Sequence, residues 1–258
     1  MGNIGETCID AVAAGNTDVY VAETSSYQLA STRLFAPDVA VVLNITPDHL
    51  SWHGSLEAYA AAKWKVLANL GASGGVAVLD ACDDAVRAKI RELRARGGVP
   101  FRYIPIGGAA GLGADMRATC GADAAAFRGA GGQLVVAWDG HVSDLVFVDD
   151  LQIKGGHNQQ NALAAAACAL VLGATDTAVG EGLLTFRPLE HRIEPAGLVD
   201  GAACYNDSKA TNVDATLVAL TAFLPTRPIV LLGGRDKGTD LAPLVAACEE
   251  NARAVVCF

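Results

Sequence analysis

Polar residues that could bind or activate a ligand follow four apolar runs of the sequence. They occupy residues 23–26 (Glu-Thr-Ser-Ser), 44–49 (Asn-Ile-Thr-Pro-Asp-His), 206–209 (Asn-Asp-Ser-Lys) and 233–237 (Gly-Gly-Arg-Asp-Lys). Each preceding run has the pattern of a β-strand, and ligands of open α/β sheets bind beyond the carboxyl ends of the strands. One such cluster would be ordinary loop chemistry, but four of four indicate a shared binding cleft.

Glu23 and His49 have side chains of the kind that ligate metals. Each follows a predicted strand and could supply an oxygen or a nitrogen to a divalent cation. A solvated or hydrogen-bonded loop residue is the alternative for each of them, and it stays open. His49 and His53 are four residues apart, as in helical zinc sites, but the flanking Pro47 and Gly54 argue against a continuous helix.

Lys63 lies at the centre of the apolar stripe of a helix predicted over residues 55–70, whereas Lys65 is expected on the opposite side. The stripe consists of Leu56, Tyr59, Ala60, Leu67 and Leu70. A lysine on a buried face must snorkel, pair with an anion or lose its charge, and snorkelling is an equally good explanation here. A neutral amine in that place could react with carbon dioxide to give a carbamate, which is an anionic metal ligand.

Two amide side chains, Asn158 and Asn161, lie about one turn apart on the same side of a helix predicted over residues 158–172. Together they could hydrogen-bond the edge of a nucleotide base, although an N-cap role would by itself explain Asn158. Arg192 could reach a phosphate, and an exposed surface arginine is the alternative. The sequence contains no GxxxxGK[ST] phosphate loop, since residues 233–239 hold these residue types in another order.

The elements that must position these residues alternate between strands and helices, which indicates an α/β fold. We expect strands at residues 18–22, 39–43 and 75–79, a hairpin of 134–138 and 142–147 turning at Asp139-Gly140, and an irregular region over 107–132. We expect helices at 24–35, 55–70, 83–96, 158–172 and 176–185. After a seam at 186–188, where a proline ends the helical pattern, the alternation resumes with strands at 202–205, 228–232 and 254–258 and helices at 212–222 and 241–251.

Composition excludes several classes of function. The chain has 258 residues, 52% of them hydrophobic, and a net charge of −9, which argues against nucleic acid or an anionic membrane surface as the main partner. No apolar run approaches the roughly 18 residues of a membrane span, so no membrane insertion is expected. Seven scattered cysteines without a CxxC pair, and an N-terminus unlike a signal peptide, predict buried thiols in a soluble, cytoplasmic protein.

Taken in order along the chain, the polar segments resemble those of the ATP-dependent Mur ligases of peptidoglycan synthesis. The matching segments are GNIG at 2–5, ETSSYQL at 23–29, NITPDH at 44–49, YAAAK at 59–63, GHNQQN at 156–161, HRIE at 191–194, NDSKATN at 206–212 and GGRDK at 233–237. Each is weak alone, but the ordered set is specific. The ETSSYQL segment favours the member of the family that adds D-glutamate.

The resemblance implies roles for individual residues. Glu23 and His49 would bind Mg²⁺ together with a carbamylated Lys63, and Asn158 and Asn161 would hold the adenine of ATP. Further roles follow for residues near the substrates: Asn3 at the muramoyl substrate or the metal site, Ser25 and Ser26 at the muramoyl substrate, Arg192 and Asp207 at the ribose and phosphates, and Lys209, Thr211 and Lys237 at D-glutamate. Lys63, His49 and Lys209 would be the catalytic residues.

The resemblance also implies a fold and a reaction. Residues 1–188 would form a central P-loop-type ATPase domain that lacks its phosphate loop, and residues 189–258 a partial Rossmann-like C-terminal domain. ATP would phosphorylate the carboxylate of UDP-N-acetylmuramoyl-L-alanine, and the amine of D-glutamate would attack the acyl phosphate. Because the phosphate loop is missing, the isolated chain is expected to lack ligase activity.

Three other interpretations remain. The chain could be a truncated, non-catalytic homologue that binds a nucleotide or a partner protein. A sister ligase that adds another amino acid is also possible. A metal-dependent hydrolase with a carbamylated lysine is disfavoured, because no His-x-His pair follows an early strand.

Overall fold

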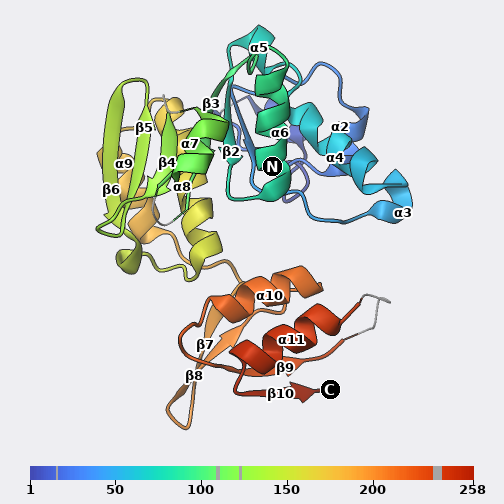
Figure 1. The fold of residues 1–258 in the computed structure, drawn as a ribbon, viewed down its shortest axis with the longest axis vertical. Helices are drawn as coiled ribbons and strands as arrows, with labels where there is room; N and C mark the ends of the chain where they lie inside the picture. Colours follow the sequence, from blue (N-terminus) through green and yellow to red (C-terminus); the bar gives the residue numbers. More distant parts are fainter. Residues whose placement is uncertain (16, 109–110, 122–123, 235–239) are drawn as a thin grey trace. The chain divides into compact units, whose positions relative to one another are not determined.

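A computed structural model describes residues 1–15, 17–108, 111–121, 124–234 and 240–258. The chain divides into two compact units. The first comprises Met1–Gly107 and Leu112–Ala125, and the second comprises Gly108–Gly111 and Ala126–Phe258 (Figure 1).

The first unit contains three adjacent parallel strands. They are β1 (Val39–Val42), β2 (Val76–Asp80) and β3 (Arg102–Ile106), with β2 in the middle. All five residues of β2 are buried, as expected of a central parallel strand, and helix α6 (Asp84–Ala95) packs against it. Leu70, Leu79, Val86 and Ile90 are fully or almost fully buried in the core beneath these elements.

The helices of the first unit are shorter than the sequence predicts. They are α1 (Cys8–Ala14), α2 (Ser26–Ser31), α3 (Leu50–His53), α4 (Leu56–Trp64), the 3-10 helix η1 (Lys65–Leu67), α5 (Leu70–Ser73) and α7 (Ala114–Cys120). The single helix expected over 55–70 is therefore wrong, because the chain tightens into a 3-10 turn after Trp64. The irregular region expected over 107–132 is also wrong, since α7 places Met116 and Cys120 against the core.

The strand expected at residues 18–22 is absent, although all five residues are described. This part of the chain forms only an isolated bridge between Gly2 and Glu23. Val19 and Val21 are 53% and 80% exposed. An apolar run becomes a strand only where another strand supplies hydrogen bonds, and residues 1–3 supply too few.

The second unit begins with a meander and two helices. Strands β4 (Ala125–Arg128, which starts at the last residue of the first unit), β5 (Gln133–Trp138) and β6 (His141–Phe147) are followed by η2 (Val148–Asp150), α8 (Gly156–Val171) and α9 (Asp176–Thr185). The predicted hairpin is confirmed: Asp139 and Gly140 both have positive φ, as a two-residue turn requires. Helix α8 packs on β5 and α9 on β6.

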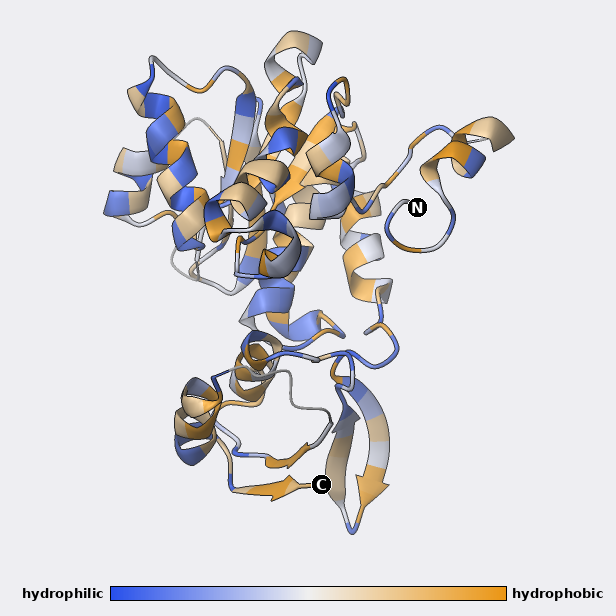
Figure 2. Ribbon diagram, turned by 90° about the vertical axis from the view of Figure 1, so that its right-hand side faces the viewer, coloured by the Kyte–Doolittle hydropathy of each residue, from blue (hydrophilic) through white to orange (hydrophobic). Residues whose placement is uncertain are grey.

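The last part of the second unit contains two small sheets. Strands β7 (Glu194–Val199) and β8 (Ala202–Asn206) are antiparallel, β9 (Ile229–Leu232) and β10 (Ala254–Cys257) are parallel, and helices α10 (Val213–Thr221) and α11 (Ala242–Asn251) complete this part. Leu220, Cys248 and Ala252 form a small core with Val230 and Leu232. The other residues of β9 and β10 are hydrophobic but exposed (Figure 2).

Two expectations from composition can be compared with the described residues. No helix among them combines the length and apolar character needed to cross a membrane. The expectation that all cysteines are buried is wrong: Cys120 and Cys248 are buried, Cys257 is exposed and the other four are half-buried, all as free thiols.

Candidate functional site

Asn3 and Glu23 are held together in the first unit. The Asn3 amide Nδ2 donates a hydrogen bond to Glu23 Oε1 at 2.8 Å, and the Asn3 backbone N–H donates to the Glu23 carbonyl at 2.9 Å. Gly2 permits this approach, because its φ is +98° and a Cβ there would lie 2.4 Å from the Glu23 carbonyl oxygen. Two residues that the sequence places in one site therefore do meet, and both side chains are exposed.

Ser25 and Ser26 use their hydroxyl groups inside the protein. Ser25 is the N-cap of α2 and forms a capping box with Gln28. Ser26 is buried, and its Oγ shares a hydrogen bond of 3.0 Å with His53 Nε2. The role predicted for these serines at a substrate stays a prediction, and their observed contacts are structural.

His49 lies where α3 begins, in an unusual backbone conformation. Its φ and ψ are 52° and 28°, a left-handed region that few residues other than glycine adopt. Its backbone N–H donates to Asp48 Oδ1 at 2.8 Å, and its ring centroid is 4.8 Å from that of Tyr27. Non-glycine residues in this conformation are concentrated at functional sites.

Sequence reasoning did not predict a group of aromatic rings centred on Tyr27 and His53, which His49 joins through Tyr27. Tyr27 contacts the rings of His49, Trp52 and His53, with centroid distances of 4.8, 5.0 and 5.8 Å. His53 also meets the Tyr59 ring edge to face at 5.4 Å. The four-residue spacing of His49 and His53 drew attention to these residues, but only as a possible zinc pair. The hydrogen-bond partner of the His53 side chain is Ser26, 27 residues away in the sequence.

Lys63 is half-buried and its Nζ lies 5.3 Å from the centroid of the Tyr59 ring. This cation–π contact stabilises an ammonium group, so the lysine pairs with a ring on its own helix. Lys65 does not point away from the protein as expected, because η1 replaces the α-helix there. Its Nζ instead donates to the carbonyl of Ala30, near the C-terminal end of α2, where a cation is favourable.

The side chains of Asn3 and Glu23 in the first unit carry oxygen atoms of the kind that suits a hydrated Mg²⁺. Within the described residues, no three His, Cys, Asp or Glu side chains are close enough together to hold a metal ion. Mg²⁺ usually keeps several waters and takes one or two carboxylates plus substrate phosphates. The exposed Glu23 carboxylate fits that mode of binding, with Asn3 fixing one of its oxygens.

Asn158 and Asn161 lie together at the start of α8 in the second unit. The Asn161 Nδ2 donates to Asn158 Oδ1 at 3.2 Å, and the Asn158 Nδ2 donates to the Lys154 carbonyl at 2.7 Å. The predicted N-cap role of Asn158 is wrong, since Gly155 is the N-cap, with φ of 90°. The helix starts two residues earlier than expected, and the two amides lie on its first turns.

Asp207, which follows β8, lies near the start of α8. Burial raises the pKa of Asp207 above its ordinary range, while the Ile193 N–H, a hydrogen-bond donor at 3.1 Å, and Arg192 oppose the shift. Burial lowers the pKa of His157, and the Asp207 charge opposes that shift. Asp207 therefore interacts electrostatically with both Arg192 and His157, the neighbour of Asn158.

The residues predicted to bind D-glutamate are only partly described. The Lys209 backbone N–H donates to the His191 carbonyl at 3.1 Å, which places the lysine beside the same loop as Arg192. Thr211 precedes Asn212, the N-cap of α10. Lys237 lies outside the described residues.

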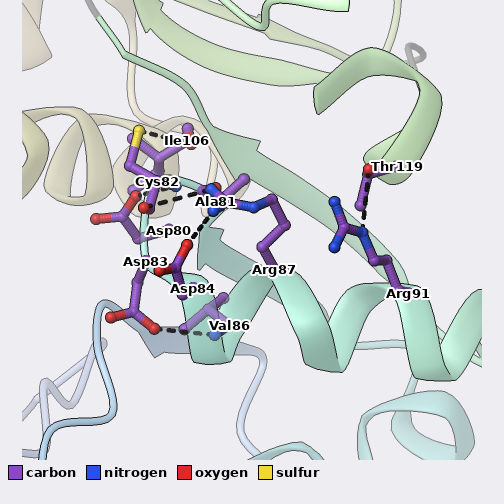
Figure 3. A network of polar contacts seen from close by, with 10 residues as sticks. All are labelled: Asp80, Ala81, Cys82, Asp83, Asp84, Val86, Arg87, Arg91, Ile106 and Thr119. Carbon is purple, nitrogen blue, oxygen red and sulfur yellow. Dashed lines mark hydrogen bonds and ion pairs between the residues drawn. The ribbon is translucent and has the colours of Figure 1, made fainter. Parts of the chain in front are cut away.

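A buried carboxylate at the end of β2 was missed by sequence reasoning. Asp80 is 5% exposed, accepts a hydrogen bond from the Cys82 N–H at 2.9 Å, and has a pKa raised by burial. Arg87 reaches from α6 to the Ala81 carbonyl at 2.8 Å (Figure 3). The sequence contains a signal for this residue: Asp80 follows the apolar residues 76–79, just as Glu23 follows the largely apolar run at 18–22.

Comparison with known proteins gives a consistent result. Residues 6–169 match the family described as the Mur ligase middle domain. Relatives named UDP-N-acetylmuramoylalanine–D-glutamate ligase from Pelotomaculum thermopropionicum, Salinibacter ruber and Chromobacterium violaceum are 38%, 40% and 41% identical to the chain. These alignments cover 99% of this chain but 52%, 53% and 52% of the relatives, so the chain spans about half their length.

Solved structures support the fold. The Mycobacterium tuberculosis folylpolyglutamate synthase complexed with ADP matches with a TM-score of 0.66 at 17% identity, covering 96% of this chain and 53% of that one. MurF from Acinetobacter baumannii matches with a TM-score of 0.60 at 19% identity, covering 92% and 54%. The predicted α/β fold of this family is therefore confirmed.

Proposed function

This chain belongs to the Mur ligase middle-domain family, and from that premise we propose that it forms the ATP-binding part of a UDP-N-acetylmuramoylalanine–D-glutamate ligase. The observation that carries the proposal is that relatives with that name align over 99% of the chain at 38–41% identity. Its substrates are then ATP, UDP-N-acetylmuramoyl-L-alanine and D-glutamate. Nucleotide-linked substrates of this kind fit the cytoplasmic location expected from the sequence.

The second unit supplies the nucleotide contacts in this proposal. Asn158 and Asn161 bind the adenine edge, because two amides one turn apart present both donors and acceptors. Arg192 contacts the phosphates, since a guanidinium donates two parallel hydrogen bonds to phosphate oxygens. The electrostatic interaction between Asp207 and His157 supports a single nucleotide site for these residues.

The first unit supplies the contacts for the reacting groups. Glu23 and His49 would hold Mg²⁺, which when bound would neutralise charge on the phosphoryl oxygens during formation of the acyl phosphate. Asn3 orients the Glu23 carboxylate through its 2.8 Å hydrogen bond. Lys63, as a carbamate, would be the third metal ligand; in the structure its Nζ lies 5.3 Å from the centroid of the Tyr59 ring.

The amine of D-glutamate then attacks the acyl carbon, the tetrahedral intermediate loses phosphate, and an amide bond forms. Thr211 and Lys237 bind the carboxylates of D-glutamate in this proposal. Lys209, the third catalytic residue with Lys63 and His49, stabilises negative charge on the phosphate that departs.

Nucleotide binding by the 258-residue chain tests the first part of this proposal. We expect ADP to bind, and Asn161→Ala to weaken binding by about fivefold, the equivalent of one hydrogen bond of about 1 kcal/mol. Gln160→Ala, on the same helix, is the matched control and should leave affinity unchanged. Equal affinities of wild type and the Asn161 variant, measured by calorimetry, would remove Asn161 from the site.

A chimera tests the second part. The chain replaces the aligned residues of the Salinibacter ruber relative, and phosphate release is measured with ATP, UDP-N-acetylmuramoyl-L-alanine and either D-glutamate or L-lysine. We expect turnover only with D-glutamate, and none from the isolated chain. A folded chimera that binds ADP but forms no product would favour the non-catalytic alternative.

A further inference from the structure

We propose that His53 is a positioning residue that fixes the His49 imidazole, and that the Ser26 hydroxyl serves His53 rather than a substrate. The functional importance of this arrangement rests on the role proposed above for His49. The arrangement itself is a matter of geometry and can be tested without activity.

Helix α3 cannot hold His49 in place by its own stability. It has four residues, between the left-handed His49 and Gly54, whose φ is 82°. A single helical turn is unstable in isolation, and the left-handed conformation of a histidine is unfavourable. Contacts with other elements must therefore fix this turn.

His53 makes such contacts with two neighbouring helices. Its Nε2 shares a 3.0 Å hydrogen bond with Ser26 Oγ of α2, and its ring stacks on Tyr27 of the same helix at an interplanar angle of 26°. On the other side, its ring meets Tyr59 of α4 edge to face at 5.4 Å. Because Ser26 is buried, the hydrogen bond fixes His53 to a rigid part of the molecule.

His53 and His49 are linked by one helical turn. The His53 backbone N–H donates to the His49 carbonyl at 3.1 Å. The His49 ring is exposed, and the ring that it meets from another element is Tyr27, which also stacks on His53. A shift of His53 would therefore move the start of α3 and separate His49 from Tyr27.

Nuclear magnetic resonance of the metal-free, histidine-labelled 258-residue chain tests the proposal. His53→Phe keeps a ring on Tyr27 but loses the bond to Ser26, and Ser26→Ala loses the same bond while leaving His53 intact. We expect both variants to move the His49 ring-proton shifts more than half-way towards those of free histidine, since the ring current of Tyr27 is lost. His53→Gln, whose amide nitrogen takes the place of Nε2, should restore part of the shift.

His141→Phe is the matched control, because His141 lies in the second unit and pairs with Asp176 there. It should leave the His49 signals unchanged. His49 shifts that equal those of the wild type in both His53→Phe and Ser26→Ala would overturn the proposal, provided that circular dichroism gives a folded chain.

A Mn²⁺ titration separates this proposal from the proposed function. Mn²⁺ should broaden the His49 ring signals of the wild type, and the two variants should need about tenfold more Mn²⁺, as is typical when a residue supporting a metal ligand is lost. Absence of broadening in the wild type would refute a metal role for His49. The shift comparison in metal-free protein would still decide whether His53 positions it.

Discussion

Two sets of parallel strands in this chain have similar sequences but are buried very differently. Strand β2 of the first unit is covered on both faces, and Leu79 is 1% exposed. Strands β9 and β10 of the second unit are equally rich in Val, Ile and Leu, yet Leu231 is 67% exposed. An apolar sequence therefore makes a strand suitable for burial, but the elements packed around the strand determine whether it is buried.

Leu79→Ala should have the largest effect among changes that probe this comparison. The side chain is surrounded by the core of the first unit, so its truncation leaves a cavity and should lower the free energy of unfolding by about 3 kcal/mol. Urea unfolding followed by circular dichroism measures the loss. A loss below about 1 kcal/mol would mean that β2 is less well packed than its burial indicates.

Asp80→Asn should change the free energy of unfolding by less than Leu79→Ala does, and it should also change how that free energy depends on pH. Burial raises the pKa of Asp80 in the folded state, so the folded protein binds the proton more tightly than the unfolded chain. Wild-type stability should therefore fall as pH rises from the ordinary range of an aspartate through the raised pKa, and this fall should be weaker in the variant. Thermal unfolding between pH 4 and 7 measures the two slopes, and parallel slopes would contradict the prediction.

Ser143→Ala probes strand β6 of the second unit, which α9 covers, and should lower stability by less than the two changes above. Hydrogen bonds from Ser143 at 2.8 Å and from His141 lower the pKa of Asp176. A lowered pKa stabilises the fold above the ordinary aspartate range, and this contribution is lost as pH falls through the lowered value.

We expect the variant to lose less than about 1 kcal/mol at pH 7, since solvent screens the partly exposed Asp176. The difference from wild type should shrink at pH 3. Carboxyl NMR should give a higher pKa for Asp176 in the variant, and an unchanged pKa would rule out Ser143 as the cause.

Leu231→Ala should have the smallest effect. The side chain faces solvent on β9, so its truncation removes little buried surface and should change stability by less than about 0.5 kcal/mol. The same urea measurement that detects Leu79→Ala serves here. A loss as large as that for Leu79 would mean that another surface covers β9 under the conditions of the experiment.

Local patterns predicted most of the elements. The Asp139-Gly140 turn, helix α9 after its Thr175 cap, and the fully apolar β2 are encoded by residues adjacent in sequence, and all three were predicted. Strand β4 was missed because it lies in the region expected to be irregular, and strands β3 and β7 were missed as well. Pro105 and Pro195 interrupt the usual pattern of these two strands, and pairing with β2 and β8 overrides that weak local preference.

The candidate site was harder to predict than the elements. Glu23 was identified by its place after an expected strand, and although that strand is absent, its contact with Asn3 needed only one close backbone approach. The surroundings of His49 and His53 could not be predicted, because Tyr27 reaches His49 from α2, and Ser26 of α2 and Tyr59 of α4 reach His53. Lys65 was misplaced for the same reason: its position depends on where an α-helix becomes a 3-10 turn.

The exposure of helix α1 has a consequence for the local unfolding of the first unit. It has seven residues, none of them buried, and its N-terminus is capped by Thr7. Its amide protons should therefore exchange with solvent deuterium through brief local fraying, without waiting for the first unit to unfold. The amide protons of β2 should exchange only in rare global openings. Within the same unit, amide exchange should therefore be fast in α1 and slow in β2.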